Sequence, residues 1–265
     1  MGRCGFLTWG WRVPFLLSAV LVGIGLTIRL SLTETPQFRK ALAAQKLSRT
    51  PVAEVLRTSW RQVILAAGTF VAPNAMGYIV ITYSLSYTTR ILHLNRNAVI
   101  WAILAASVIW LIVAGWVAAM SDRWGRRRVL VVCLVALTIW SLVFFALLDT
   151  GSFPLMLLAL VVLAALQGAA NGPQAALFAE LFETHVRYSG ISLAYQAGSI
   201  LGGGVAPFLA TALYDIRLSS LPVTGYLVLI SIVSLSCALA IRESGRHHQS
   251  LSSRTAGQPG LHTHE

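Results

Sequence analysis

The chain has 265 residues, of which 56% are hydrophobic and 11% are charged, and its mean hydropathy is +0.72. This composition excludes a soluble domain that hides its apolar residues in one core, and it indicates a protein whose solvent is lipid. The formal net charge of +11 does not indicate a nucleic-acid-binding protein, because the basic residues lie between apolar segments instead of gathering on one solvated face.

Seven segments that contain no Asp, Glu, Lys or Arg organise the chain. They are residues 13–28, 62–89, 97–121, 129–148, 150–179, 188–214 and 218–241. Six of them reach the roughly 20 residues that an α-helix needs to cross a hydrocarbon core, and the first reaches this length if Arg29 snorkels to the interface. The pattern therefore predicts an all-α membrane protein with seven transmembrane helices.

Residues 1–30 are expected to form the N-terminal span. Their opening, MGRCGFLTWGWR, lacks the order of a cleavable signal peptide, in which a charged stretch is followed by an apolar stretch and a cleavage site. Cys4, Cys133 and Cys237 are too few and too scattered for a disulfide framework or a thiolate metal site. We expect these cysteines to pack as small apolar residues.

Residues 31–61 are expected to form a cytoplasmic linker that contains a short interfacial helix from Val52 to Trp60. A helical wheel places Val52, Val55, Leu56 and Ser59 toward the bilayer and Glu54, Arg57 and Arg61 toward water. This division is typical of a helix that lies in the membrane plane. A plain solvated linker is the alternative interpretation.

Residues 62–241 carry the other six spans, which fall into two groups of three. Three plus three helices of opposite topology are the architecture of one half of a large transporter. Residues 242–265 are rich in Ser, Gly, His and Arg, so we expect a disordered cytoplasmic tail. Its histidines have no fixed geometry and no further ligands, and we predict no metal site.

The basic residues predict the orientation of the spans. If the spans alternate, one side receives Arg29, the linker, residues 121–128, residues 179–187 and the tail, with 15 Lys and Arg in total. The other side receives five: Arg3, Arg12, Arg90, Arg96 and Arg217. The positive-inside rule places the first side in the cytoplasm. We therefore predict a multi-pass cell-membrane protein with a cytoplasmic C-terminus and an outside N-terminus.

A tight cytoplasmic turn at residues 121–128 carries the densest group of charges. Gly125 supplies the backbone freedom that such a turn needs. Asp122 ends one predicted helix, and Arg123, Arg126 and Arg127 surround the start of the next. Ion pairs among them could hold two helices in one of two arrangements. An ordinary basic loop that obeys the positive-inside rule is the alternative interpretation.

The sequence Asp-Arg-x-Gly-Arg-Arg at residues 122–127 resembles the cytoplasmic signature of the major facilitator superfamily. Three more segments resemble the metabolite:proton symporter family within it, namely Gly10–Ser18, Arg29–Phe38 and Glu180–Gly190. The resemblance implies that the seven spans correspond to helices six to twelve of a twelve-helix fold. It also implies that the last six form the C-terminal half of that fold, as 3+3 inverted repeats.

Three residues depart from the family pattern. Ala118 stands where the signature usually has Gly, which still permits close packing. Glu183 and His185 replace the Pro and Arg that are more usual in the later loop, and this weakens any expectation of intact gating there. We expect His185, which is alone in this loop, to be solvated; a proton relay is the alternative interpretation.

Polar residues inside the spans are the candidates for a solute cavity, because transporter sites lie near the bilayer midplane. Three sets share a helical face: Asn74, Tyr78 and Thr82; Gln167, Asn171 and Gln174; Tyr195 and Ser199. A cavity lining requires such stripes, but interhelical hydrogen bonds that only hold a bundle together give the same spacing. For the glycine run after Ser199, close helix packing is the favoured interpretation.

Taken with the resemblance, these features predict proton-coupled, alternating-access transport of a small polar metabolite of the organic acid or betaine class. The expected partners are membrane lipid, the solute, protons and an N-terminal transporter half. No Asp, Glu, Lys or Arg lies in the middle of a span, and the family carries its coupling groups largely in the N-terminal half. We therefore expect a C-terminal half or fragment that is inactive alone.

Two other classes compete with the transporter. Seven spans with an outside N-terminus also fit a receptor or sensor, but no span holds a Lys for a retinal Schiff base. A membrane enzyme would need clustered His, Asp or Glu, or a nucleophile with its base, and the spans contain no His or carboxylate. We expect no enzymatic activity, no cofactor and no nucleic-acid partner.

Overall fold

The computed structural model describes residues 9–31, 51–90, 92, 94–183, 185–217 and 219–241. The chain divides into two compact units, Met1–Leu47 and Ser48–Glu265. The predicted tail at 242–265 and most of the predicted linker lie outside the described residues. Every regular element in the described part is a helix, as the composition predicted.

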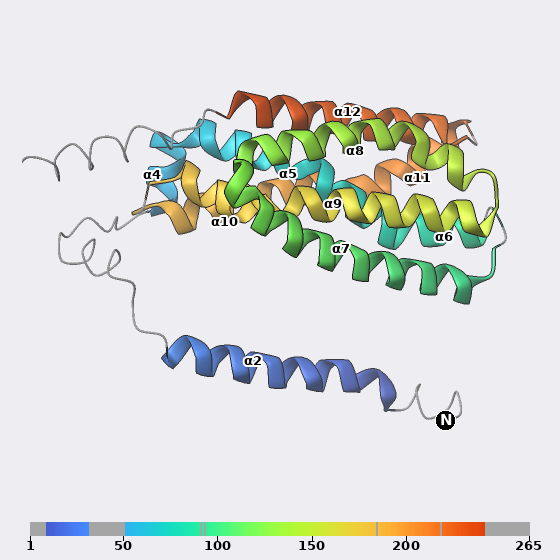
Figure 1. The fold of residues 1–265 in the computed structure, drawn as a ribbon, viewed down its shortest axis with the longest axis horizontal. Coiled ribbons are helices and arrows are strands. Elements are labelled where there is room, and N and C mark those ends of the chain that lie inside the picture. Colours follow the sequence, from blue (N-terminus) through green and yellow to red (C-terminus); the bar gives the residue numbers. More distant parts are fainter. Residues whose placement is uncertain are drawn as a thin grey trace, which may run out of the picture. The chain divides into compact units, whose positions relative to one another are not determined.

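The first unit contains one turn of 3₁₀-helix, η1 (Gly10–Arg12), and the helix α2 (Val13–Ser31), drawn in blue in Figure 1. The apolar stretch of α2, Phe15–Ile28, is shorter than the six helices that are long and apolar enough to span a membrane. A seventh transmembrane helix therefore remains a prediction.

The second unit contains all six helices of membrane-spanning length and hydropathy in the described part (Figure 1). Its elements are α4 (Pro51–Thr58), α5 (Trp60–Tyr78), η2 (Ile79–Ser84), α6 (Leu85–Arg90), α7 (Arg96–Trp124), α8 (Arg126–Leu148), α9 (Phe153–Leu181), α10 (Arg187–Ser199), η3 (Ile200–Gly204), α11 (Ala206–Arg217) and α12 (Leu221–Ala240). The segments η2 and η3 are π-helices, so α5–η2–α6 and α10–η3–α11 each form one span with a π-helical insert. Such inserts are frequent at functional sites.

Capping residues set the ends of α7. Asn95 precedes the helix, and its side-chain oxygen accepts a hydrogen bond from the Asn97 amide at 2.9 Å. Gly125 ends α7 and begins α8 with a φ of +93°, a conformation that side chains disfavour. The chain therefore reverses there, and α7 and α8 run in opposite directions. We call this end of the bundle the signature end and the opposite end the far end.

The bundle is organised around α5 and α9. The helix α5 packs against α9, α10, η3 and α12, and α9 packs against α7 and α8. Large apolar side chains fill the spaces between them; Phe144, Phe145 and Met156 are fully enclosed. The outer surface is apolar too, since Trp101 and Trp116 of α7 are 70% and 67% exposed. Such a surface is stable in lipid and would aggregate in water.

Close backbone approach joins α7 to α9. A Cβ atom on Gly172 would lie 2.6 Å from the Ala114 carbonyl oxygen and 2.9 Å from the Ala118 amide nitrogen. The small residue needed for this contact is thus supplied by α9, and Ala118 fits where the family usually has Gly. Small residues that let backbones approach closely are the usual means of helix association in lipid.

The short helix α4 lies within the predicted linker, but it does not present all its apolar residues outward. Val55, predicted to face the bilayer, is fully buried against Val63, Phe182 and Val186. Leu56 is 53% exposed, in keeping with the predicted face. Docking on α10 and α5 explains the difference, because one side of α4 packs on protein. An interfacial position for this helix remains a prediction.

The α7–α9 contact predicts opposite effects for two Gly→Ala changes. Gly172→Ala should lower stability by about 1–3 kcal/mol, because a methyl group is forced against backbone. Gly115→Ala, on the same pair of helices, meets nothing within 4 Å and should be neutral or stabilising. Thermal unfolding midpoints in detergent measure both, and equal midpoints for the two variants would contradict this packing.

Candidate functional site

A proline inside α5 leaves one backbone carbonyl without its helical partner. Pro73 has no N–H, so the Thr69 carbonyl lacks the hydrogen bond that residue 73 would normally donate. The side chain of Gln174 on α9, which is fully buried, lies in hydrogen-bonding range of this oxygen, with Nε2 at 3.4 Å. This contact supports the interhelical interpretation of Gln174, because its amide serves the backbone of the neighbouring helix.

One turn of α5 is also bridged by a serine from α12. Ser234 Oγ donates to the Gly68 carbonyl at 2.6 Å and accepts from the Ala72 amide at 3.0 Å. Gly68 and Ala72 are the acceptor and donor of one helical turn, so the hydroxyl lies at the rung before the one that Pro73 removes. A side chain inserted in this way loosens a helix locally.

A second glutamine of α9 contacts the same region. Gln167 Nε2 donates to the Pro73 carbonyl at 2.8 Å, and its amide lies where a Cβ atom of residue 77 would be, so Gly77 leaves room for it. Gln167 thus also makes an interhelical hydrogen bond. Asn171, the third member of this set, lies between Gln167 and Gln174 in the sequence. Its side chain is half-buried.

The other two candidate sets meet at the contact between α5 and η3. Asn74 Nδ2 donates to the Ser199 carbonyl at 3.5 Å, a long hydrogen bond. A Cβ atom on Gly203 would lie 2.5 Å from the Tyr78 ring and 2.8 Å from Asn74 Nδ2. The glycine run therefore does permit close helix packing, as the sequence favoured. Tyr78 nevertheless keeps 49% of its surface exposed.

The remaining two candidates differ in environment. Tyr195 lies edge-on to Phe70 at 4.8 Å between ring centroids and contacts Phe178 at 5.1 Å, so its ring is part of an aromatic cluster. Thr82, in η2, is exposed. Tyr78 and Thr82 are thus the most accessible of the eight cavity candidates, and their roles as cavity-lining residues remain predictions.

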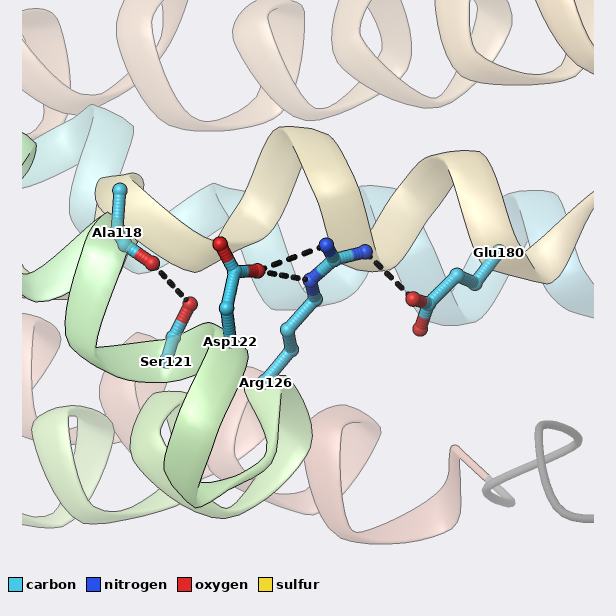
Figure 2. A network of polar contacts seen from close by, with 5 residues as sticks. All are labelled: Ala118, Ser121, Asp122, Arg126 and Glu180. Carbon is cyan, nitrogen blue, oxygen red and sulfur yellow. Dashed lines mark hydrogen bonds and ion pairs between the residues drawn. The ribbon is translucent and has the colours of Figure 1, made fainter.

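Ion pairs form at the signature end, as the spacing of charges there suggested (Figure 2). Arg126 donates to one oxygen of Asp122 from Nε at 3.1 Å and from Nη2 at 2.8 Å. Its Nη1 donates to Glu180 at 2.5 Å. Because Glu180 lies near the end of α9, the network joins the α7–α8 turn to a third helix. Glu180 belongs to the loop segment quoted above, but nothing in the sequence marked it as the partner of Arg126.

The other residues of the signature have different surroundings. Arg127 donates to the carbonyls of Ala238 at 3.3 Å and Leu239 at 2.6 Å, and so satisfies the last turn of α12. Arg123 is exposed and makes no ion pair with another described residue. The sequence placed Arg127 among candidate ion-pair residues, but its contacts are with backbone carbonyls. A gating role for these residues remains a prediction.

His185 is not alone in its loop, although its side chain keeps 29% of its surface exposed. Its Nε2 lies 3.2 Å from Glu54 of α4, and its Nδ1 lies 3.5 Å from Glu183. The imidazole therefore links the α9–α10 loop to the docked short helix. Two acidic neighbours occur because Glu183 departs from the family pattern and because α4 folds back onto this loop.

A polar cluster at the far end was missed by sequence reasoning. Asp149, which follows α8, accepts 2.5 Å hydrogen bonds from the hydroxyls of Tyr87 and Ser220. Tyr87 also stacks on Tyr83 with 5.7 Å between ring centroids. Three spans are joined at this carboxylate. The only sign of this cluster in the sequence was Asp149 itself, a single Asp between two apolar runs. Its partners could not be identified, because they are about 60 to 70 residues away in sequence.

The sequence profile of the Major Facilitator Superfamily matches residues 65–261. The chain belongs to this superfamily. It is 36% identical to the inner membrane metabolite transport protein YhjE of Escherichia coli K12 over 93% of this chain and 56% of that protein. It is 31% identical to the glycine betaine/proline/ectoine/pipecolic acid transporter OusA of Dickeya dadantii, over 92% and 50%. The shikimate transporter of Escherichia coli K12 is 30% identical, over 91% and 56%.

This major facilitator chain spans about half the length of the relatives it matches. These relatives are named as transporters or transport proteins, and their names do not support the receptor interpretation. The resemblance seen at residues 122–127 is therefore confirmed at the level of the superfamily. Multi-pass insertion follows from the family and the six apolar helices.

The serine bridge predicts a selective loss of stability. Ser234→Ala removes both a donor and an acceptor at a buried site and should cost about 1–3 kcal/mol. Ser236→Ala removes only a hydroxyl that bonds back to Ile232 on the same exposed helix face, and should change little. Thermal unfolding in detergent compares the two. A Ser234→Ala midpoint equal to that of Ser236→Ala would rule out a stabilising bridge.

The signature network predicts a small, salt-sensitive coupling between Arg126 and Glu180. The two side chains are 30% and 58% exposed, so solvent screens the pair and we expect a coupling of about 1 kcal/mol or less. A double-mutant cycle with Arg126→Gln and Glu180→Gln measures it. High salt should reduce the coupling. A matching cycle between Arg128 and Glu180 should give none, and equal values in both cycles would refute a specific pair.

Proposed function

We propose that this chain forms the C-terminal half of a proton-coupled transporter for small polar metabolites of the organic acid or betaine class. In this proposal, residues 62–241 are the 3+3 repeat, and an N-terminal half completes the cavity. Alternating access is rocking of one half against the other. The coupling carboxylate belongs to the N-terminal half, because the middle of every span in this chain lacks Asp, Glu, Lys and Arg.

The observation that carries the proposal is a polar stripe along one span whose other exposed residues are mostly apolar. Asn74, Tyr78 and Thr82 follow one another at intervals of four residues, and the last two are exposed. Exposed polar groups are unfavourable against lipid tails, so this face belongs against a water-filled cavity or a partner half. Ser86 and Thr89 continue the stripe toward the far end.

The same region has the helix irregularities that a moving or solute-binding segment needs. Pro73, the Ser234 bridge and the π-helix η2 all lie in this span. In transporters, interrupted helices near the midplane expose backbone groups to the solute. In our proposal Asn74 and Tyr78 contact the solute, whereas Gln174 and Gln167 hold the irregular helix in place.

The charges at the signature end fit a cytoplasmic latch. The Asp122–Arg126–Glu180 network joins α7, α8 and α9. Arg127 of α8 also donates a hydrogen bond to the last turn of α12. We propose that this network keeps these four helices together as one rigid body while the halves rock. The excess of Lys and Arg on this side supports a cytoplasmic position, with the C-terminus inside, and α2 as a seventh span would place the N-terminus outside.

An uptake assay tests the proposed function. The chain is co-produced with the first five helices of its metabolite transport relative, and uptake of labelled glycine betaine and shikimate is measured with and without a proton uncoupler. We expect uncoupler-sensitive uptake only when both pieces are present. Tyr78→Ala should reduce the uptake rate more than tenfold if Tyr78 contacts the solute during transport. Ile81→Ala, on an exposed apolar position of the same span, is the matched control.

If both pieces are present in the membrane and uptake does not exceed that of either piece alone, the proposed function is contradicted. Uptake that ignores the uncoupler would remove proton coupling but leave solute transport.

A further inference from the structure

At the far end is a hollow of about 360 Å³ whose lining includes five of the residues that the structure describes. They are Thr82 of η2, Leu85, Ser86 and Thr89 of α6, and Arg96, the first residue of α7. The volume lies in the range of small-molecule pockets. The described part of the lining combines one guanidinium, three hydroxyls and one apolar side chain.

The arginine in this hollow has no partner among the residues that the structure describes. The side chain of Arg96 takes part in none of the described ion pairs and side-chain hydrogen bonds. A guanidinium presents donors in a planar fork that matches a carboxylate bidentately. The start of α7 adds positive potential at the same place, since helix N-termini carry partial positive charge.

Two of the hydroxyls can donate to a bound anion. Thr82 and Ser86 form no side-chain hydrogen bond with the rest of the described chain, and so their protons are available. Thr89 differs, because its hydroxyl donates to the Leu85 carbonyl at 2.6 Å. Thr89 therefore shapes the rim, while Leu85 offers an apolar wall to the body of a solute.

We propose that Arg96, Thr82 and Ser86 form an entry site that captures the carboxylate of the solute before it reaches the cavity. The site lies on the stripe that begins at Asn74 and Tyr78, at the end of α7 opposite the cytoplasmic signature. The inference rests on the proposed function for its solute class. Its occupant is a small carboxylate of that class, and Leu85 contacts the carbon skeleton of the solute.

Capture at this position has a physical advantage. A carboxylate must lose water before it enters a cavity in the membrane, and a paired guanidinium replaces part of that hydration. The hollow lies near the end of its span, so the charge of Arg96 remains solvated when no solute is bound. The pairing energy between the carboxylate and Arg96 is modest in such an exposed position. The solute can therefore leave the entry site and move on to the cavity.

A cysteine-protection experiment on the purified chain in detergent tests the entry site without requiring transport. The native Cys4, Cys133 and Cys237 are replaced by Ala, and Thr89→Cys at the rim reports on the hollow without removing a proposed binding group. Its reaction with a neutral methanethiosulfonate is timed with glycine betaine, shikimate, choline or inorganic phosphate present. Glycine betaine and shikimate should slow the reaction about threefold at twice their dissociation constants. Choline, which lacks a carboxylate, should not.

Arginine variants identify the group responsible. Arg96→Gln should abolish protection by carboxylates, and Arg96→Lys should keep the charge but weaken protection because the fork is lost. Arg128→Gln removes one exposed charge at the signature end and should leave protection intact. The ratio of the reaction rates of anionic and cationic reagents at Thr89→Cys should fall about tenfold in Arg96→Gln, because a nearby unit charge is removed. Unfolding midpoints establish that each variant is folded.

Three results would overturn the proposal: no protection in the parent chain, equal protection by choline, or unchanged protection in Arg96→Gln. Equal protection by phosphate would overturn the carboxylate specificity and indicate a general anion site instead. If Arg96→Gln does not fold, Arg96→Lys and the salt dependence of the reagent ratio decide the outcome. Protection without uptake would contradict only the proposed function, and uptake without protection only the entry site.

Discussion

The backbone of α5 is the constraint on which the bundle depends. In lipid there is no water to satisfy a free carbonyl, so a helix with an internal proline needs donors from its neighbours. Gln174 of α9 lies at the Thr69 carbonyl, and Ser234 of α12 bridges the adjacent rung. A π-helix follows within the same span. Two helices must therefore hold their places relative to α5 for its backbone groups to be satisfied.

The two ends of the bundle are held differently. At the signature end, charged side chains join helix termini, and Arg126 and Arg127 reach α9 and α12. At the far end, a carboxylate accepts from hydroxyls, and Asp149 links Tyr87 to Ser220. Between the two ends, large apolar side chains such as Phe144 fill the interior, and small residues approach the backbone of a neighbouring helix, as at Gly172. Such an arrangement behaves as one packed body, as the rocking motion proposed above requires.

Much of the fold followed from the sequence, because hydropathy and length constrain what can cross a bilayer. The run 97–121 predicted α7, yet the helix extends to Arg96 and Trp124, since terminal charges can lie at the interface while still helical. The spacing of polar residues placed Gln167 and Gln174 on one face of a helix, and both contact α5. It could not predict that Gln174 serves the backbone of α5, because the Thr69 carbonyl is 105 residues away.

Sequence alone determined that this chain is helical, lives in lipid, carries a charged turn at residues 122–127 and belongs with the major facilitators, because composition, periodicity and local motifs are properties of neighbouring residues. Only the tertiary structure decided which partners those residues have. Glu180 joins Arg126, Arg127 caps α12, Val55 is buried and Arg96 stays unpaired over a hydroxyl-lined hollow among the described residues. Each of these outcomes depends on helix packing, which brings together groups that no local pattern relates.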